Sequence, residues 1–434
     1  MPIPAALLLV AALGLVLSGC DSTPPRFAGD DVQRLKWEHQ SGQPLDQAQA
    51  DIEDALAYLF GTPDEPRVPQ PLRPLVDADN LVRAAGPVYS TEDGKHFGLY
   101  REHCAVCHGL EGNGRGPAAG MQKPYPRDFR MGVFKFKSTP RGQRPTRDDL
   151  MRTIVAGEPG TAMPTFAASV PEEDREALID YVIYLSVRGQ LQRELFALAA
   201  TEYDYGSDQL AAEERLFAAE AEQQDAELFA EQLQVIDGLL ADIVQPWRQA
   251  SRQETPVPPV PAYVGRTVKA AAAERHAASI ERGETLFHGN IANCVGCHGP
   301  AGNGEATTLD FDDWTKDWTT RIGITPDDDE ATEPFRRAGA LRPRQARPRN
   351  LQLGAFRGGS DPDLLYLRIV NGIDGTPMPA VPLVDQPSGA GLTPDQVWDL
   401  VNYVLSLSDA DVGAVRAEDV LGPELPPITP ATGG

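Results

Sequence analysis

The sequence predicts an all-α fold in which two small, similar helical domains are joined by a helical and proline-rich connector. The pentapeptide Cys-x-x-Cys-His occurs twice, at residues 104–108 and 294–298, and each copy is followed by the same order of expected helices. Aromatic residues make up only 7% of the 434 residues, whereas glycine and proline are frequent. This composition favours small domains with long irregular connections.

The repeated pentapeptide is the strongest chemical signal in the chain. Its spacing lets two thiols form thioethers with one haem while the adjacent histidine reaches the iron. A lone Cys-x-x-Cys also suits half a zinc site or a redox pair, but zinc requires four ligands and a redox pair needs no histidine. Here the match extends through Gly-x-x-Gly-Asn-Gly in both copies. We therefore expect two covalently bound haems c, attached at Cys104, Cys107, Cys294 and Cys297.

The iron ligands are expected to be one histidine and one methionine for each haem. His108 and His298 close the pentapeptides, and no histidine follows His298. Met163 lies in Gly-Thr-Ala-Met-Pro and Met378 in Gly-Thr-Pro-Met-Pro, and the following proline restricts each loop. A lone methionine is usually a core residue, but two in matching contexts between the same two helices favour ligands. Iron with six ligands favours electron transfer over substrate chemistry.

Two further methionines, Met121 and Met131, have no counterpart in the second half, and we expect them to be packing residues. The two halves also share Pro-Arg-Asp-Phe at 126–129 and Pro-Arg-Asn-Leu at 348–351. Pro126 lies 18 positions after His108, whereas Pro348 lies 50 positions after His298, so the second half carries an insertion of 32 residues.

Helical spacing of apolar residues predicts an accessory helix over 46–60 and three helices in each half that correspond to one another. These are expected over 92–103, 148–155 and 171–185, and over 277–287, 361–370 and 393–407. The sequence thus divides into a signal peptide (1–20), an N-terminal accessory segment (21–83), a first haem domain (84–190), an acidic helical connector with a proline-rich linker (191–274), a second haem domain (275–408) and a disordered tail (409–434).

The N-terminus indicates export. Residues 5–17 are apolar but too short to span a bilayer comfortably. They end in Leu-Ser-Gly-Cys, which resembles a bacterial lipobox and implies cleavage before Cys20 and attachment of lipid to its sulfur. An ordinary signal peptide with a chance cysteine is the alternative. The expected location is the outer face of the cell membrane, facing the periplasm.

The connector is strongly acidic, with twelve acidic residues and one basic residue from 202 to 242. Apolar residues recur at spacings of three and four from Phe229 to Trp247, which predicts a helix with one apolar stripe. The stripe could dock a partner, but we favour packing against this chain's own haem domains.

The formal net charge of −24 is unfavourable for binding nucleic acid and suits partners with basic faces, although it is equally compatible with solubility alone. Against this background, residues 127–152 and 336–349 are rich in arginine and lysine. Arg127 and Arg349 are equivalent in the repeat, and we expect them to contact haem propionates, since the planar guanidinium suits carboxylates. The other basic residues form either partner-facing patches or solvated loops.

Both halves resemble class I cytochrome c domains, over residues 90–188 and 280–408. Together they resemble membrane-anchored dihaem c-type cytochromes of bacterial respiratory chains. The resemblance implies a helical fold around each haem, proximal ligation by His108 and His298, distal ligation by Met163 and Met378, and transfer of single electrons.

The function expected first is electron transfer, as a lipid-anchored relay or subunit of a respiratory complex with redox protein partners and no catalytic activity of its own. The alternative is a dihaem redox enzyme, of the peroxidase or thiosulfate-oxidising type. A peroxidase requires an open haem, and a thiosulfate-oxidising enzyme would typically use a cysteine ligand, for which no cysteine is spare. A haem-based sensor would require an output domain, and none is evident.

Overall fold

A computed structural model describes residues 25–207, 209–305 and 309–408. The predicted signal peptide with Cys20 and the predicted tail lie outside the described residues. The expectation of an all-α fold is confirmed, because the strands of the described chain form only two sheets of two strands, with two residues in each strand. Within the described ranges, no helix has both the length and the apolar character that crossing a bilayer requires.

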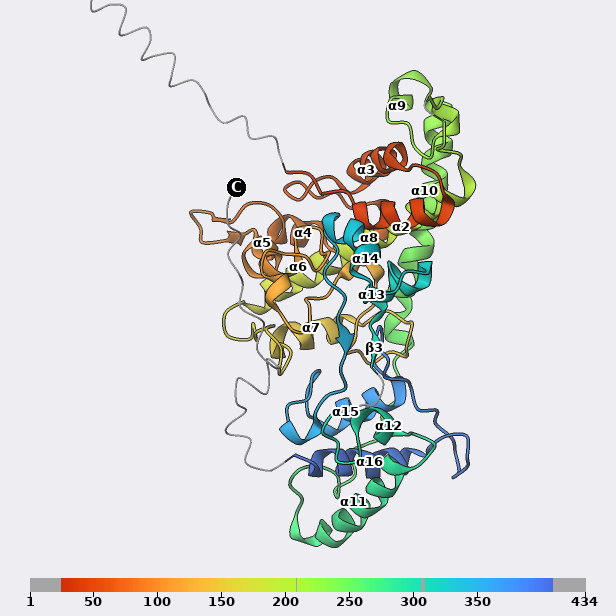
Figure 1. The fold of residues 1–434 in the computed structure, drawn as a ribbon. Coiled ribbons are helices and arrows are strands. Elements are labelled where there is room, and N and C mark those ends of the chain that lie inside the picture. Colours follow the sequence, from red (N-terminus) through yellow and green to blue (C-terminus); the bar gives the residue numbers. More distant parts are fainter. Residues whose placement is uncertain (1–24, 208, 306–308, 409–434) are drawn as a thin grey trace, which may run out of the picture.

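The N-terminal segment and the first haem domain occupy the upper part of Figure 1. Their α-helices are α2 (Asp31–Ser41), α3 (Asp46–Phe60), α4 (Ala78–Ala84), α5 (Leu99–His103), α6 (Ala105–His108), α7 (Arg147–Ala156) and α8 (Glu172–Glu202). The 3-10 helices are η1 (Gln70–Leu72), η2 (Ala119–Met121) and η3 (Phe129–Met131). Helix α7 begins at a capping box in which Thr146 and Asp149 satisfy each other's backbone N–H groups.

The expectation of a helix over residues 92–103 is wrong for most of its length. Strand β1 (Tyr89–Ser90) pairs with β2 (His96–Phe97) in a hairpin, and helix α5 starts only after it. The physical reason is two glycines, since Gly94 and Gly98 have φ of 85° and 77°. Those left-handed conformations close the turn and interrupt a helix.

Helix α8 is longer than the expected 171–185 and continues through residue 190, where we placed the end of the first haem domain. The reason is that its second half is also buried, with Leu191, Leu195 and Phe196 inaccessible to solvent. Helix α8 packs against α2, α3, α4 and α10. A single core of buried side chains consequently runs from Phe27 to Trp247 and includes the accessory segment, the first haem domain and the connector.

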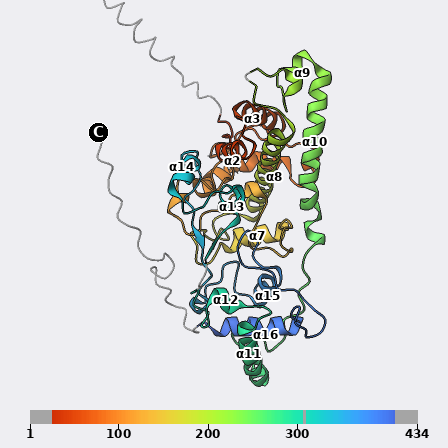
Figure 2. The same ribbon diagram turned by 45° about the vertical axis from the view of Figure 1, so that its right-hand side comes forward.

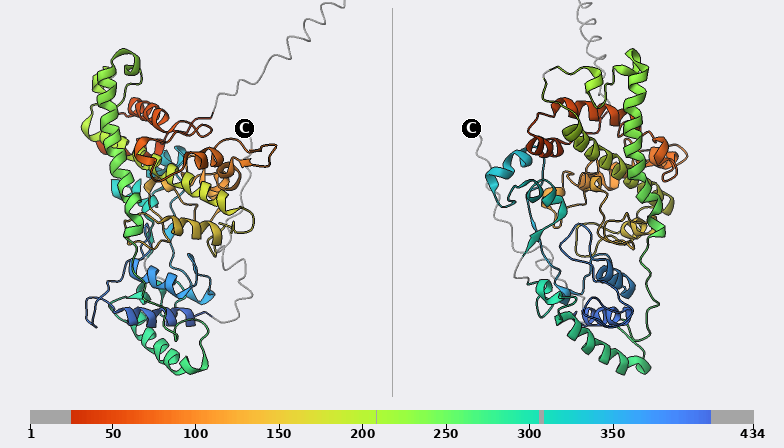
Figure 3. Two further views of the ribbon diagram at one scale, coloured as in Figure 1. Left: turned by 180° about the vertical axis from the view of Figure 1, so that it is seen from behind. Right: turned by 90° about the vertical axis from the view of Figure 1, so that its right-hand side faces the viewer.

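The connector contains η4 (Ala212–Glu214), α9 (Ala221–Gln224), α10 (Ala226–Gln249) and η5 (Ala250–Arg252). The apolar stripe of α10 faces this chain's own core, as we favoured, with Ile236 and Leu240 fully buried and Trp247 edge-on to Phe134 at 5.9 Å. Figure 2 shows α10 along one side of the molecule. The extended proline-rich linker descends from it to the second domain (Figure 3), and the N–H of Thr255 donates to the carbonyl of Ser138 at its start.

The second haem domain lies below the first in Figure 1 and has its own, smaller core. Its elements are η6 (Ala270–Ala272), α11 (Ala273–His288), α12 (Cys294–His298), η8 (Leu351–Leu353), α15 (Pro362–Asn371) and α16 (Pro394–Ser406). Helices α11 and α16 pack closely, because Gly283 faces the backbone of Asp399 at the crossing. Trp398 is almost completely buried and lies 4.6 Å from the ring of Tyr366.

The insertion of the second half forms a structured arm that reaches up to the N-terminal segment. It consists of β3 (Asp310–Phe311), α13 (Asp313–Asp317), η7 (Thr320–Ile322), α14 (Asp329–Arg337) and β4 (Gln345–Ala346). Trp318 and Phe335 stack at 5.4 Å and share a buried cluster with Val32 of α2. The carboxylate of Asp317 pairs with Lys36 (2.9 Å) and Arg193 (2.8 Å). The arm thereby fastens the second haem domain to α2 and to the C-terminal half of α8, which pack beside the first haem domain.

Candidate haem sites

The two pentapeptides adopt the same local structure. In each, the histidine ends a short helix, α6 or α12, and its Nδ1 lies next to a backbone carbonyl, that of Arg127 for His108 (2.9 Å) and that of Arg349 for His298 (3.0 Å). A carbonyl only accepts hydrogen bonds, so Nδ1 carries the proton and the lone pair is on Nε2. This is how proteins orient a histidine that ligates a metal through Nε2.

Burial keeps both imidazoles in the neutral form that a metal requires. Desolvation lowers the pKa of His108 to about 4 and also lowers the pKa of His298. Phe129 stacks on His108 with ring centroids 4.7 Å apart and planes 17° apart. The ring of His108 is therefore fixed by a hydrogen bond at one edge and an aromatic contact on one face.

The loop after each histidine is also duplicated at the level of single hydrogen bonds. The N–H of Gly114 donates to the carbonyl of His108, and the N–H of Gly304 to that of His298, both at 2.9 Å. Both glycines have positive φ, 68° and 79°, and a Cβ on either would collide with the backbone of the Pro-Arg motif. The glycine positions shared by the two halves are explained by this close approach.

The four cysteines that the structure describes form no disulfide. Cys104 and Cys107 flank one helical turn beside His108, and Cys294 and Cys297 do the same beside His298. Two thiols and an imidazole on one turn form the donor set that attaches a haem c through two thioethers and one axial ligand.

Each candidate methionine lies on a tight loop directly after the helix that the sequence predicted before it. The N–H of Glu158 donates to the carbonyl of Met163, and the N–H of Ile373 to that of Met378, both at 3.2 Å. The hydroxyl of the threonine two positions earlier accepts from each methionine N–H, at 3.1 Å for Met163 and 3.3 Å for Met378. The two loops are thus equivalent in backbone conformation.

The expected propionate contacts, Arg127 and Arg349, belong to a cationic cluster. We use this name for four residues near the boundary of the haem domains: Arg127, Lys135, Arg349 and Arg357. None of them forms an ion pair with a carboxylate of the described residues, although the chain is strongly acidic. Desolvation lowers the pKa of Arg127 to about 10, and desolvation together with the charge of Arg127 lowers that of Lys135 to about 7.

Two donors of the cationic cluster have no hydrogen-bond acceptor among the described residues: Nη2 of Arg349 and Nε of Arg357 are both buried. Buried donors of this kind are rare in folded proteins and call for an acceptor. The carboxylates of a haem would supply acceptors and negative charge at once. The residues present therefore fit the group that the pentapeptides indicate.

Sequence reasoning missed several parts of these sites. It did not identify Phe129 on His108 or the carbonyl acceptors of Arg127 and Arg349, although the Pro-Arg motif shared by both halves was the available signal. It also missed Trp314, whose ring lies 3.4 Å from the guanidinium of Arg127. Met121 was expected to pack but is 76% exposed, because it ends a 3-10 turn at the surface.

Two family models match the chain, one in each half. Residues 93–182 match the model of the cbb3-type cytochrome c oxidase subunit III, and residues 280–408 match that of cytochrome c. No curated protein matches the chain. A solved structure that resembles it is the reducing HAO-like protein complex Kustc0457/Kustc0458 of Kuenenia stuttgartiensis, with 24% identity over 74% of this chain and 98% of that chain and a TM-score of 0.41.

Proposed function

Because this chain contains two cytochrome c domains, each with a covalently bound haem c, we propose that it relays single electrons between redox partners at the outer face of a bacterial cytoplasmic membrane. In this role it is a mobile relay or a subunit of a respiratory complex, held to the membrane through lipid on Cys20. The haem group supplies a one-electron iron couple. The chain attaches, orients and shields it.

The duplicated geometry supports the following assignment of each residue. Cys104 and Cys107 attach the first haem, and Nε2 of His108 is its proximal ligand. Met163, on the loop after α7, is its distal ligand. In the second half, Cys294 and Cys297 attach the haem, with His298 and Met378 as ligands. The observation that carries the proposal is this repetition, hydrogen bond for hydrogen bond, of a neutral histidine and a methionine loop.

Most of the remaining histidines are engaged elsewhere, which favours methionine as the second ligand. Both ring nitrogens of His288 lie beside backbone carbonyls, those of Glu284 (2.9 Å) and Pro300 (3.1 Å), and Nε2 of His39 lies 3.2 Å from the carbonyl of Ile322. His96 contacts Glu102 at 2.6 Å, and His103 packs on Phe166. Ligation by histidine and methionine gives a higher potential than ligation by two histidines, and it leaves the iron without an open position.

A spectroelectrochemical titration tests electron transfer against the enzyme alternative. The holoprotein should show two one-electron steps, both haems low-spin, with no binding of carbon monoxide and no reaction with peroxide. A high-spin haem that binds carbon monoxide or turns over peroxide would instead support the dihaem enzyme.

The lipid anchor requires its own test. In cells supplied with labelled fatty acid, the unmodified protein should become labelled and Cys20→Ala should not, because no thiol remains to be acylated. Ser22→Ala is the matched control and should be labelled like the unmodified protein. An unmodified protein that takes up no label, or a Cys20→Ala protein that is labelled equally, would contradict the lipid anchor.

A further inference from the structure

The methionine loop of the second haem domain is held by side chains of the first. The loop in question, residues 372–379, follows α15 and carries Met378. Arg141, on the segment between η3 and α7, donates from Nη1 to the carbonyl of Met378 (3.0 Å) and from Nη2 to that of Thr376 (3.0 Å). Nη1 also donates to the carbonyl of Ile373 (3.4 Å), so a single guanidinium bridges three carbonyls of the loop, one of them belonging to the expected ligand itself.

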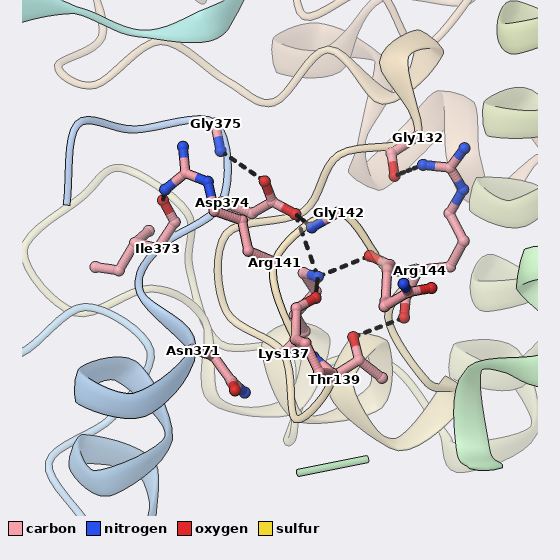
Figure 4. Close-up of polar contacts among 12 residues, drawn as sticks. Gly132, Lys137, Thr139, Arg141, Gly142, Arg144, Asn371, Ile373, Asp374 and Gly375 are labelled. Atoms are coloured by element: carbon pink, nitrogen blue, oxygen red, sulfur yellow. Dashed lines mark hydrogen bonds and ion pairs between the residues drawn. The ribbon is translucent and has the colours of Figure 1, made fainter. Parts of the chain in front are cut away.

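A buried ion pair lies beside the guanidinium of Arg141. Nζ of Lys137 lies 3.2 Å from Oδ2 of Asp374, and the side chains of these residues are only 3% and 8% exposed. The N–H of Gly142 donates to the same carboxylate oxygen (2.8 Å). Figure 4 shows Lys137 and Gly142 converging on Asp374 from the first domain, with Arg141 beside Ile373.

The supporting segment is itself well fixed. Nζ of Lys137 also donates to the carbonyls of Pro140 and Gln143, at 2.5 and 2.7 Å. Arg144 donates to the carbonyl of Gly132 (2.8 Å), and its own carbonyl accepts from the hydroxyl of Thr139 (2.8 Å). Residues 137–144 thus form a rigid support rather than a loose loop that happens to touch its neighbour.

The corresponding loop of the first haem domain lacks this arrangement. Among the described residues, no hydrogen bond from the second domain reaches a carbonyl of residues 157–164. The cross-domain hydrogen bond made there runs from the N–H of Gly358 to the carboxylate of Glu158 (2.8 Å). Proline occupies position 159, where the second half has Asp374. Support of the methionine loop by side chains of the other domain is therefore found in the second half and is not shared by the two halves.

We propose that Arg141 and the Lys137–Asp374 pair are positioning residues for Met378, so that methionine ligation at the second haem depends on docking to the first domain. This inference rests on the proposed function, in which Met378 is the ligand. The guanidinium and the ion pair hold the loop in the ligating conformation, and loss of either lets the sulfur leave the iron more often. Haem ligation and domain docking are thereby coupled.

The test compares variants of the full-length holoprotein by two spectroscopic readouts. The first is the near-infrared band of ferric iron bound to methionine, and the second is the affinity of the second haem for added imidazole, which competes with the methionine. Arg141→Ala removes the hydrogen bonds that hold the loop and should raise that affinity. The increase should be only severalfold, because Arg141 is exposed and hydrogen bonds of an exposed side chain contribute little. Asp374→Asn should raise it about tenfold or more, because a buried pair is broken. The first haem is the internal reference in the same sample.

Two further variants distinguish positioning of the methionine loop by Arg141 from an effect of its positive charge alone. Arg141→Lys retains the charge but cannot bridge two carbonyls, so it should behave more like Arg141→Ala than like the unmodified protein. Arg73→Ala removes the same charge from an exposed residue at the end of η1 that, within the described chain, forms no hydrogen bond with residues 137–144 or 372–379, and it should leave the second haem unchanged. Hydrogen exchange of the amides of residues 372–379 should accelerate in Arg141→Ala and Asp374→Asn alone.

The inference is overturned if Arg141→Ala and Asp374→Asn leave the band and the imidazole affinity unchanged, or if Arg73→Ala alters them as much as Arg141→Ala. Met378→Ala distinguishes this failure from failure of the proposed function. If Met378→Ala abolishes the methionine band of the second haem while the positioning variants do nothing, only the inference is wrong. If Met378→Ala also leaves the band intact, the ligand assignment itself is wrong.

Discussion

The first haem domain is embedded in a core that runs from Phe27 to Trp247, whereas the second is enclosed by a separate and smaller cluster of buried side chains around Trp398. The accessory helices α2 and α3 and the connector helix α10 pack against helix α8 of the first domain. In the second domain, the inserted arm contacts α2, and the methionine loop contacts the first domain. Equivalent haem sites are thus supported in two different ways, and the second depends more on its surroundings.

The largest expected difference concerns haem attachment. The double variant Cys294→Ala/Cys297→Ala should leave the second domain unfolded, because a small domain without its covalent haem buries too little apolar surface to fold. The matched variant Cys104→Ala/Cys107→Ala should retain much of its helix content, since its core extends far beyond the haem site. Limited proteolysis and far-ultraviolet circular dichroism measure both. Equal loss of structure in the two variants would contradict the claim that the first haem domain is stabilised by a larger core than the second.

Single core substitutions test the same difference more finely. Phe60, from the accessory helix α3, is fully buried and lies edge-on to Tyr184 of α8 at 5.5 Å. Phe60→Ala should cost about 3–5 kcal/mol and destabilise the first haem domain, although Phe60 lies outside it. Trp398→Ala should cost a similar amount in the second domain alone. Thermal unfolding followed at each haem shows which domain is affected, and a Phe60→Ala protein with an unchanged first haem would disprove the shared core.

The arm that joins the domains supplies a prediction of intermediate size. Asp317→Asn removes the negative charge that faces Lys36 and Arg193 and should cost about 2 kcal/mol or more, seen as easier proteolysis of the arm. Asp313→Asn, on the same helix with a more exposed partner, is the control and should have little effect.

The same carboxylate predicts a pH dependence. Burial by itself would raise the pKa of Asp317, but Arg193 and Lys36 hold it well below its ordinary value. The contact therefore contributes its full stability above the unfolded pKa of about 3.9, and this contribution is lost as pH falls below that value. The stability difference between the unmodified protein and Asp317→Asn should be constant from pH 5 to pH 7 and shrink below about pH 4. A difference that grows on acidification would refute the ion pair.

The smallest effects are expected at the cationic cluster. Arg127→Gln and Arg349→Gln should each lower the potential of a haem by tens of millivolts, because a positive charge that offsets the propionates is lost. Arg127 is stacked on Trp314, whereas Arg349 donates from Nε to the carbonyl of Ala355 (2.9 Å). Arg67→Gln, on the connection after α3, is the charge-matched control. Potentials that shift no more than in this control would argue against propionate contacts.

Local patterns in the sequence were sufficient for the helices that flank each methionine. Residues 148–155 and 361–370 become α7 and α15, and 393–407 becomes α16, since apolar spacing and capping residues lie within each segment. The hairpin before Cys104 was missed because two glycines outweigh the local apolar pattern. The extension of α8 was missed because its second half is stabilised by helices distant in the sequence.

In the haem sites, too, the features within short motifs could be predicted from the sequence, and the contacts between distant residues could not. Cysteine, histidine and methionine positions could be proposed from short motifs, and the structure gives the motifs of both halves matching hydrogen bonds. The contacts of Arg141 with Met378 and of Trp314 with Arg127 join residues far apart in the chain. Their pairing depends on how the two domains dock, which no local spacing encodes.

The most direct test of the account is the near-infrared spectrum of the fully oxidised holoprotein, quantified per haem. We expect a methionine–iron band with the intensity of two low-spin haems per chain, reduced to half in Met163→Ala and to half in Met378→Ala. A band that corresponds to a single haem in the unmodified protein, or one that survives both substitutions, would contradict ligation by histidine and methionine at both sites.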